Sequence, residues 1–401
     1  MKVLMVHNRY QQRGGEDAVV DAEVRLLAAN GIEVQRFDAD NDAIQGLVTK
    51  IQVSLGQFGL PTAAQSRFKN SLFEFRPDVV HVHNWFPTLS PSLFNICSRE
   101  NVPVVHTLHN YRLLCVNATL FRDGNVCEDC IGTTFRTPGI LHSCYRGSTV
   151  GSAVATAGML THWSIGTWSR SINRFVALTE FARHKLLEGG LPADKVVVKP
   201  NFIDPDPGPG AGRGGYFLFA GRLTEEKGIR VLLECWKHGQ DLPKLKIAGT
   251  GPLENEVRAA VSTMPNVEWL GARSSDEVIG LMADASALLC PSQWYEGMPR
   301  VVIESLAVGT PIIASRIGCY PEMIVDGETG ALFPAGDALS LRSSLRDLLQ
   351  HNSLCSMRGN ARGCFQSNYT GDKNFSTLLN VYRSVLKSRE LVQSRAVPAG
   401  T

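Results

Sequence analysis

The chain has 401 residues, 44% of them hydrophobic, and carries 40 Lys and Arg against 38 Asp and Glu. This length is enough for two domains, each with its own hydrophobic core. The near balance of charge argues against a nucleic-acid-binding protein, which normally has a strong surplus of basic residues. A mean hydropathy close to zero excludes a multispanning membrane protein and a disordered chain.

Residues 1–7 form an apolar run that is too short for a signal peptide, and no small-residue cleavage site follows it. We expect a buried first strand in a cytoplasmic protein. The most apolar long stretch, residues 150–168, contains His162 and many Gly, Ala, Ser and Thr residues. Because polar residues inside a membrane span are costly, an internal helix is favoured there, with a membrane span as the alternative.

Short runs of branched apolar residues alternate with amphipathic segments of helical length, which is typical of βαβ units and a parallel sheet. The strand expected over residues 2–7 leads through Gly14 and Gly15 into a helix that ends at Gly31, where a left-handed cap is wanted. Further strands are expected over residues 32–37, 78–83, 103–106, 174–178 and 195–199. These elements predict one doubly wound, Rossmann-like domain over residues 1–203.

Residues 204–215 consist almost entirely of Pro, Gly and Asp and are predicted to form a domain linker. A second set of strands is expected over residues 216–220, 245–249, 267–270, 287–290 and 311–314. They predict a second Rossmann-like domain over 216–372, then a helix over 373–390, for which a return to the first domain is one option, and a flexible tail over 391–401. Ligands of such domains bind in a cleft at the carboxyl ends of the strands.

The segment Glu296-Gly-Met-Pro-Arg-Val-Val-Ile-Glu304 directly follows the strand that ends near Cys290. Pro299 suits the first position of a helix that ends before Gly309, and the start of this helix offers backbone N–H groups to an anion. Apolar neighbours place Glu304 on a largely buried helix, where a carboxylate needs a partner. The two carboxylates are suited to two hydroxyl-bearing parts of one diphosphate ligand.

Two loops of the second domain carry further candidate ligand-binding residues. Gly221 ends the first strand of this domain, and the loop after it brings Arg222 and Lys227 to a position where they can bind a pyrophosphate. Gly249 and Gly251 follow the next strand and leave room for a ligand to approach the backbone. No third glycine follows at the dinucleotide spacing, so an NAD site is disfavoured.

In the first domain, Gly15 lies in the turn between the first strand and helix, where a phosphate can meet a helix terminus. His109 follows a strand at its carboxyl end, a position that favours a functional role over a structural one. His81 and His83 alternate at another strand end. A metal pair is one interpretation of them, but no third ligand lies nearby in the sequence.

Together these motifs resemble glycosyltransferase family 4, whose members are retaining enzymes of the GT-B fold. The resemblance covers residues 1 to about 385. It rests on Gly14-Gly15-Glu16, residues 78–83, His109, Gly221-Arg222, Lys227-Gly228, Gly249-x-Gly251-Pro and, above all, Glu296-x7-Glu304 followed by Gly309-Thr-Pro311. Residues 318–322, Gly-Cys-Tyr-Pro-Glu, depart from the Gly-Gly pair that relatives commonly have.

The resemblance implies two Rossmann-like domains that face each other across a cleft. It implies that Glu304 binds the ribose of a nucleotide-sugar donor, that Glu296 binds the donor sugar, and that His109 meets the sugar near its reacting face. Arg222 and Lys227 would neutralise the diphosphate in place of a divalent metal ion. The implied donor-binding residues are Gly15, Gly221, Gly249, Gly251, Gly297, Met298, Pro299, Arg300, Val301 and Glu304.

The resemblance further implies a mechanism in which no carboxylate nucleophile lies beneath the sugar and the leaving phosphate oxygen takes the acceptor's proton. We therefore expect a retaining transferase that moves a hexosyl unit from a nucleotide-diphosphate sugar to a glycan or lipid-linked glycan in bacterial surface polysaccharide biosynthesis. Peripheral contact with the inner membrane is a further option. Alternatives are a sucrose- or trehalose-type synthase with a soluble acceptor and a catalytically silent GT-B binding subunit.

A polar, Gly-containing insertion over about residues 110–147 carries Cys115, Cys127, Cys130 and Cys144. The gap between Cys127 and Cys130 is that of a zinc knuckle, and a loop of this length needs something to order it. A closed structural zinc site is expected, with free thiols or a redox pair as alternatives. Four arginines along the insertion are candidates for contact with a lipid-linked pyrophosphate or anionic headgroups, or are ordinary surface residues: Arg112, Arg122, Arg136 and Arg146.

Overall fold

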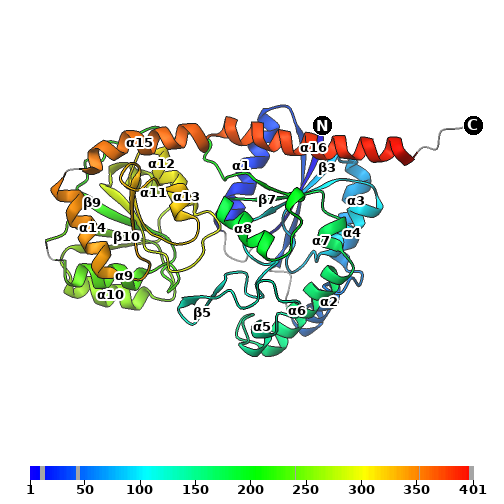
Figure 1. Ribbon diagram of the computed structural model, residues 1–401, viewed down its shortest axis with the longest axis horizontal. Coiled ribbons are helices and arrows are strands. Elements are labelled where there is room, and N and C mark those ends of the chain that lie inside the picture. Colours follow the sequence, from blue (N-terminus) through cyan, green and yellow to red (C-terminus); the bar gives the residue numbers. More distant parts are fainter. Residues whose placement is uncertain (10–13, 42–45, 240, 352, 397–401) are drawn as a thin grey trace, which may run out of the picture. The chain divides into compact units, whose positions relative to one another are not determined.

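The computed structural model describes residues 1–9, 14–41, 46–239, 241–351 and 353–396. The chain forms two compact units (Figure 1). Unit 1 consists of Met1–Ala118, Glu128–Pro200 and Asn374–Thr401, and unit 2 consists of Thr119–Cys127 and Asn201–Lys373.

Unit 1 contains a six-stranded parallel sheet in the order β2-β1-β3-β4-β7-β8. Its strands are β1 (Lys2–Arg9), β2 (Glu33–Asp40), β3 (Val79–Asn84), β4 (Val104–Leu108), β7 (Arg174–Ala177) and β8 (Val196–Val198). The order changes direction between β1 and β3. At such a switch point the connections leave toward opposite faces of the sheet, which opens a ligand crevice at the carboxyl ends of the strands.

Helices cover both faces of this sheet. They are α1 (Gly15–Ala29), α2 (Gly46–Gly56), α3 (Ala63–Phe75), α4 (Ser92–Arg99), α5 (Thr137–Leu141), α6 (Thr149–Ser164), α7 (Thr167–Arg170), α8 (Glu180–Glu188) and the unit 1 part of α16 (Gly371–Ala396). The core joins Val3 and Met5 of β1 to Leu27 of α1 and to Leu378 and Tyr382 of α16. The last helix is therefore an integral part of unit 1.

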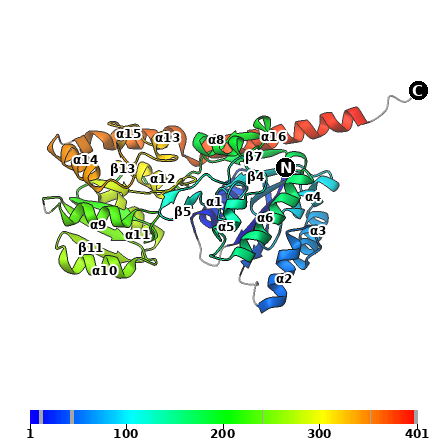
Figure 2. The same ribbon diagram turned by 60° about the horizontal axis from the view of Figure 1, so that its bottom comes forward.

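Unit 2 contains a parallel sheet in the order β11-β10-β9-β12-β13-β14, whose direction changes between β9 and β12. Its strands are β9 (Tyr216–Ala220), β10 (Lys244–Ala248), β11 (Val267–Gly271), β12 (Ala287–Cys290), β13 (Ile312–Ser315) and β14 (Gly330–Phe333). The helices that flank it (Figure 2) are α9 (Ile229–Lys237), α10 (Glu254–Thr263), α11 (Ser275–Asp284), α12 (Arg300–Ala307), α13 (Tyr320–Met323), α14 (Ala338–Gln350) and α15 (Ser353–Asn368). A short hairpin, β5 (Phe121–Arg122) and β6 (Asn125–Val126), belongs to the same unit.

The predicted fold class, two doubly wound parallel sheets, is confirmed. Every strand expected from the sequence is present, with ends shifted by at most three residues. Strand β14 and the β5–β6 hairpin were not predicted, because runs of four and two residues carry too little periodicity. Helix α1 ends at Asn30, and Gly31 follows with φ of 76°, in agreement with the expected left-handed cap.

The segment 204–215 has neither helix nor regular strand, and it lies in unit 2. The backbone N–H groups of Gly210 and Gly212 donate to the carbonyl oxygens of Val308 and Ala283, at 2.8 and 2.9 Å. The chain changes unit at Pro200, before this segment, so the Pro/Gly-rich run packs against unit 2.

Two expected features differ in the structure. Residues 150–168 form two helices, α6 and α7, because Gly166 adopts φ of 74° between them. Residues 391–396, expected as a flexible tail, continue α16, since this stretch contains neither Gly nor Pro; the rest of that tail lies outside the described residues. Among the described helices, none combines the length and apolar character that a membrane span requires.

Candidate functional site

The first candidate site lies in unit 2 at the carboxyl ends of β9 and β12, the neighbouring strands at which the sheet order changes direction. The loop after β9 carries Arg222 and Lys227, and the loop after β12 carries Glu296. Gly228 brings the two loops into contact: its φ is 73°, and a Cβ atom there would lie 1.8 Å from the carbonyl oxygen of Pro291. Only glycine allows this approach.

Lys227 and Glu296, 69 residues apart, form a close ion pair. The Nζ atom of Lys227 donates to both carboxylate oxygens of Glu296, at 2.6 and 2.8 Å. Ser292 donates from Oγ to Oε1 of Glu296 at 2.8 Å, and the hydroxyl group of Tyr320 lies 3.4 Å from the same oxygen. Glu296 is only 6% exposed, and these contacts hold its carboxylate in one position.

The electrostatic surroundings keep this carboxylate ionised. Burial by itself would raise the pKa of Glu296, but the charge and hydrogen bonds of Lys227 and the hydrogen bond from Ser292 outweigh it and lower the pKa below the ordinary value. Glu296 is therefore negatively charged at neutral pH and accepts hydrogen bonds only.

Ser292 and Tyr320 were not singled out by the sequence analysis. The Ser292 Oγ and Tyr320 hydroxyl oxygens lie 3.0 Å apart although 28 residues separate them in the chain. Gly318 makes this contact attainable: its φ is 58°, and a Cβ atom there would lie 3.3 Å from the Cα atom of Tyr295. The departure of residues 318–322 from the family pattern was the signal that could have drawn attention to this loop.

Glu304 lies inside α12, whose N-cap is Pro299. Glu304 is 6% exposed, and its Oε1 atom lies 2.8 Å from Nε of Arg300, one turn earlier. Burial raises the pKa of Glu304, and the neighbouring Arg300 charge offsets this only in part. The expected buried carboxylate with a partner is thus present, and Arg300, predicted as a donor contact, is that partner.

The close packing of two loops already accounts for two of the predicted donor-binding glycines. Gly249 has φ of 138°, and a Cβ atom there would lie 1.9 Å from the carbonyl oxygen of Gly221. A Cβ atom on Gly251 would lie 2.6 Å from the carbonyl oxygen of Leu223. These glycines are required for contact between the loops after β9 and β10, whether or not a ligand approaches them.

The remaining predicted donor residues lie around the Lys227–Glu296 pair. Arg222 is exposed, and within the described part of the chain its guanidinium group makes no ion pair. Met298 is buried, and its sulfur atom lies 3.1 Å from the backbone nitrogen of Asn201, which gives it a packing role. Contacts of Gly297 and Val301 with a donor stay predictions.

The second candidate site lies in unit 1 at the carboxyl ends of β3 and β4. His83 lies near the end of β3 and His109 directly follows β4, with 2.9 Å between Nδ1 of His83 and Nε2 of His109. The Nε2 atom of His83 lies 3.2 Å from Oε2 of Glu23, and Lys199 donates to Oε1 of the same carboxylate. Burial, followed by the effect of nearby His83, holds the pKa of His109 well below its usual value, so the ring is neutral at pH 7.

Gly15 is the first residue of α1, and a Cβ atom there would have no neighbour within 4 Å. The turn before it is held by Asp17, which accepts from the backbone N–H of Gly14 at 2.7 Å and lies 2.8 Å from Nε2 of His7. Helix α1 thus begins beside β1. The open space at Gly15 is compatible with the prediction that a phosphate approaches the N-terminus of this helix.

One cluster in the described residues has three metal-ligand side chains within reach of each other: Glu23, His81 and His83. Glu23 and His81 of this cluster already have partners within the protein. Lys199 binds Glu23, and both ring nitrogens of His81 are engaged, by Tyr382 at 2.7 Å and Thr107 at 2.8 Å. An ammonium group at the carboxylate does not suit a cation site, so these contacts disfavour the metal interpretation of His81 and His83.

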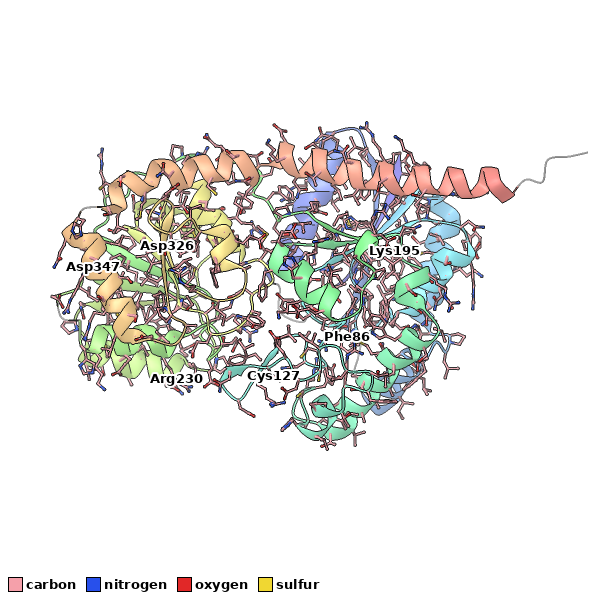
Figure 3. The ribbon with its side chains drawn as sticks, viewed as in Figure 1. Phe86, Cys127, Lys195, Arg230, Asp326 and Asp347 are labelled. Carbon is pink, nitrogen blue, oxygen red and sulfur yellow. The ribbon has the colours of Figure 1, made fainter. Side chains whose placement is uncertain are left out.

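The structure gives the predicted zinc site no support. Within the described residues, Cys115, Cys127, Cys130 and Cys144 do not form a metal-ligand group, and none forms a disulfide bond. Cys127 (Figure 3) belongs to unit 2 and the others belong to unit 1.

Arg136, an expected acceptor contact, has a different role. It is 4% exposed and donates to the carbonyl oxygens of Leu113 and Leu114, at 2.6 and 3.2 Å. The guanidinium group therefore supplies hydrogen bonds to the backbone of the insertion and is one source of order in this loop.

The other three arginines are more accessible. Arg112 lies over the ring of Phe86, 4.3 Å from its centroid, and Arg146 lies 5.5 Å from the ring centroid of Tyr145. Arg122 lies on the β5–β6 hairpin of unit 2, 3.6 Å from Asp123. These contacts leave an acceptor role for Arg112 and Arg146 as a prediction.

An apolar pocket of about 300 Å³ lies in unit 1 between α2, α6 and the loop after β3. Val53, Phe86 and Val154 form part of its wall, and the described lining residues include Arg146 but neither Asp nor Glu. Phe86 (Figure 3) also lines a small cavity of about 30 Å³ to which His83 and His109 contribute. The apolar pocket and the histidine site thus share a wall.

Comparison with known proteins agrees with this fold. The model of Glycosyltransferase Family 4 matches residues 13–207, and that of Glycosyl transferases group 1 matches residues 214–351. The first match spans β2 to β8 of unit 1 and the second spans β9 to β14 of unit 2, so the two models together cover most of both parallel sheets.

Curated relatives include the phosphatidyl-myo-inositol mannosyltransferase of Mycobacterium leprae, which is 30% identical over 56% of this chain and 63% of its own length. The D-inositol 3-phosphate glycosyltransferase of Corynebacterium diphtheriae is 24% identical over 92% of this chain and 89% of its own length. The amylovoran biosynthesis glycosyltransferase of Erwinia amylovora is 30% identical over 42% of this chain and 45% of its own length. The chain thus spans less than two thirds of the length of several relatives that it matches.

Solved structures share the fold along nearly the whole chain. The Anabaena protein HepE in complex with UDP-glucose has a TM-score of 0.66 and 14% identity, covering 96% of this chain and 100% of that one. Sucrose-phosphate synthase from Thermosynechococcus elongatus has a TM-score of 0.70 and 16% identity, covering 96% and 99%. The chain therefore belongs to the family 4-like glycosyltransferases of the GT-B fold.

Proposed function

We propose that this protein transfers a hexosyl unit, with retention of anomeric configuration, from a nucleotide-diphosphate sugar to a glycan or lipid-linked glycan during surface polysaccharide biosynthesis. The observation that carries the proposal is the Lys227–Glu296 pair at the switch point of unit 2. A buried, ionised carboxylate that accepts hydrogen bonds suits sugar hydroxyl groups. The relatives support the same class of reaction, since they include a phosphatidyl-myo-inositol mannosyltransferase and an amylovoran biosynthesis glycosyltransferase.

Three further residues have roles in this proposal. Glu304, buried with Arg300, would accept hydrogen bonds from the ribose hydroxyl groups. Exposed Arg222 would bind the diphosphate and, with Lys227, stabilise the negative charge that develops on the leaving nucleotide. HepE has been solved with UDP and UDP-glucose, which supports a uridine nucleotide as the first donor to test.

The direct test is Glu296→Ala, assayed for transfer from UDP-sugars with purified protein. Transfer is expected to fall by about 100-fold or more, because a hydrogen-bond acceptor of the transition state is lost. Glu328→Ala, an exposed glutamate of the same unit, is the matched control and should retain full turnover. Undiminished transfer by Glu296→Ala, with folding unchanged in circular dichroism, would remove the site assignment.

The acceptor is proposed to be amphipathic, because the apolar pocket of unit 1 has a cationic side chain, Arg146, in its wall and adjoins the histidine site. Ile51 and Leu55 are exposed on α2, the helix that contributes Val53 to the pocket wall, and they are proposed to contact the membrane surface, with the protein on the cytoplasmic side. Figure 1 shows α2 and α6 side by side.

A second candidate is a sucrose-phosphate-synthase-like reaction on a soluble acceptor, favoured by the TM-score of 0.70 to that enzyme. Acceptors that carry the same sugar on a long polyprenyl diphosphate or on a short water-soluble chain distinguish the two. A KM at least about tenfold lower for the long chain is expected from burial of apolar surface in the pocket. Equal KM values, or transfer only to free sugar phosphates, would favour the second candidate.

A further inference from the structure

Four polar side chains form a series of contacts that ends at His109, and each of them comes from a different part of unit 1. Lys199 follows β8, Glu23 lies on α1, His83 on β3, and His109 after β4. Glu23 and His83 are almost completely buried, and 176 residues separate Glu23 from Lys199. Three of the four groups, Lys199, Glu23 and His83, are buried, and buried polar groups are costly unless each satisfies the next, so their contacts constrain the positions of the protons.

The proton positions follow from donor and acceptor chemistry. Lys199 has only donors and therefore donates to Oε1 of Glu23. The other carboxylate oxygen, Oε2, lies 3.2 Å from Nε2 of His83, and neither atom has a better partner among the described residues. A carboxylate only accepts, so the proton of a neutral His83 is on Nε2.

The same argument extends to His109. With its proton on Nε2, His83 has a lone pair on Nδ1, 2.9 Å from Nε2 of His109, so Nε2 of His109 carries a proton and donates. The charges of Lys199 and Glu23 neutralise each other. His83 is therefore taken as neutral, because a charged ring would add a net charge to the buried cluster. The remaining nitrogen of His109, Nδ1, then holds a lone pair.

Other charged or titratable groups surround the two histidines. His7 of β1, with Asp17 of α1 behind it, acts on His109, and His106 of β4 and Arg112 line the same small cavity as His109. His81 of β3 lies beside His83, with 4.4 Å between the ring centroids. Burial lowers the pKa of His7, His81 and His106 below the ordinary value, so these rings add no positive charge near pH 7.

We propose that Glu23 and Lys199, acting through His83, are positioning residues that fix His109 as its Nε2–H tautomer. His109 then presents Nδ1 as an acceptor and binds a hydroxyl group of the substrate, not a phosphate or ether oxygen. This rests on the proposed function, in which His109 meets a sugar. The cavity of about 30 Å³ beside His109 has room for one hydroxyl group or water molecule.

Glu23→Gln tests the proposal because Lys199 dictates how the new amide is oriented. The amide oxygen has to accept from Lys199, so the amide NH₂ group faces Nε2 of His83. That contact moves the proton of His83 to Nδ1 and the proton of His109 from Nε2 to Nδ1. The expected result is a neutral His109 of the wrong tautomer and a kcat lower by about 100-fold or more, with a smaller change in the donor KM.

The tautomer is read from the ring ¹⁵N shifts of the full-length protein labelled at histidine, with His109→Gln identifying the signals. Asp21→Asn, the same change at another carboxylate of α1, should alter neither the shifts nor kcat. In Glu23→Gln with Lys199→Met, the amide is free to turn its oxygen toward His83. This double variant should recover the Nε2–H tautomer and part of kcat.

Two results overturn the proposal: a wild-type His109 protonated on Nδ1, or a Glu23→Gln variant with unchanged ¹⁵N shifts. If the tautomer of His109 changes as expected but kcat stays the same, turnover does not depend on the tautomer. That result would overturn the role of His109 as a hydrogen-bond acceptor. Because the ¹⁵N shifts are measured without substrate, they stand even if the wild-type protein transfers no sugar, and such a failure would count against the proposed function alone.

Discussion

At the scale of single residues, the two glutamates of the Glu-x7-Glu motif are buried to the same degree but differ in their pKa. Three groups around Glu296, among them Lys227 and Ser292, overcome the cost of burial and lower its pKa. Glu304 has Arg300 alone, and burial raises its pKa. Glu296 thus stabilises the folded state at neutral pH, whereas an ionised Glu304 costs free energy until a ligand supplies donors.

We therefore expect Glu304→Gln to stabilise the protein at pH 8. A raised pKa means that the folded state binds a proton more tightly than the unfolded state. The wild type accordingly loses stability as pH rises from the unfolded carboxyl pKa, near 4.5, through the folded one. The variant lacks this loss. The difference in free energy of unfolding between variant and wild type, measured with urea, should therefore grow as pH rises between the two carboxyl pKa values and then level off.

The change should also weaken binding of the donor nucleotide if Glu304 binds the ribose. A variant that is less stable than the wild type at pH 8 but not at pH 4 would mean that the ion pair with Arg300 outweighs burial.

At the scale of elements, the active arrangement of unit 2 depends on loops that touch through glycine. Gly228 joins the loops after β9 and β12, and Gly318 joins the loops after β12 and β13. In both cases a side-chain contact follows from the backbone contact: Lys227 reaches Glu296, and Tyr320 reaches Ser292.

Gly228→Ala should cost about 3 kcal/mol or more, because the added Cβ atom meets the carbonyl oxygen of Pro291 at 1.8 Å and φ is positive. Gly271→Ala is a matched control, since Gly271 has φ of 72° but no atom within 4 Å of the added Cβ atom. It should cost only about 1 kcal/mol. Urea unfolding measures both, and equal costs would show that the loop contact is unimportant for stability.

At the scale of the whole molecule, the chain returns to unit 1 after completing unit 2. Leu378, Tyr382 and Val385 of α16 lie in the same core as Val3 and Met5. The core of unit 1 thus combines residues of β1 with residues of α16, which follow unit 2 in the sequence.

Leu378→Ala is expected to destabilise unit 1 by about 2 to 5 kcal/mol, since the side chain is fully buried. Hydrogen exchange should become faster in β1 and β3, with little change in the strands of unit 2. Leu339→Ala, at a leucine that is 67% exposed on α14, should lie within about 0.5 kcal/mol of the wild type. Unchanged exchange in β1 would argue against a contribution of α16 to the core.

Much of the fold and part of the candidate site could be read from the sequence. The alternation of apolar runs predicted the strands of both sheets, because a buried parallel strand requires a continuous apolar run. The apolar neighbours of Glu304 predicted that it lies on a buried helix, which is a local signal of the same kind. The cysteine spacing suggested zinc, but residues close in sequence are not brought together as ligands there.

The sequence by itself determined the two doubly wound sheets, the glycine-rich loops at their strand ends and the family of the protein, because these depend on periodicity and short motifs. Only the tertiary structure decided the partners of the charged groups: Lys227 with Glu296, Tyr320 with Ser292, and Lys199 with Glu23 and His83. The physical reason is that strand order brings together residues that lie tens to hundreds of positions apart, and no local pattern encodes which of them meet.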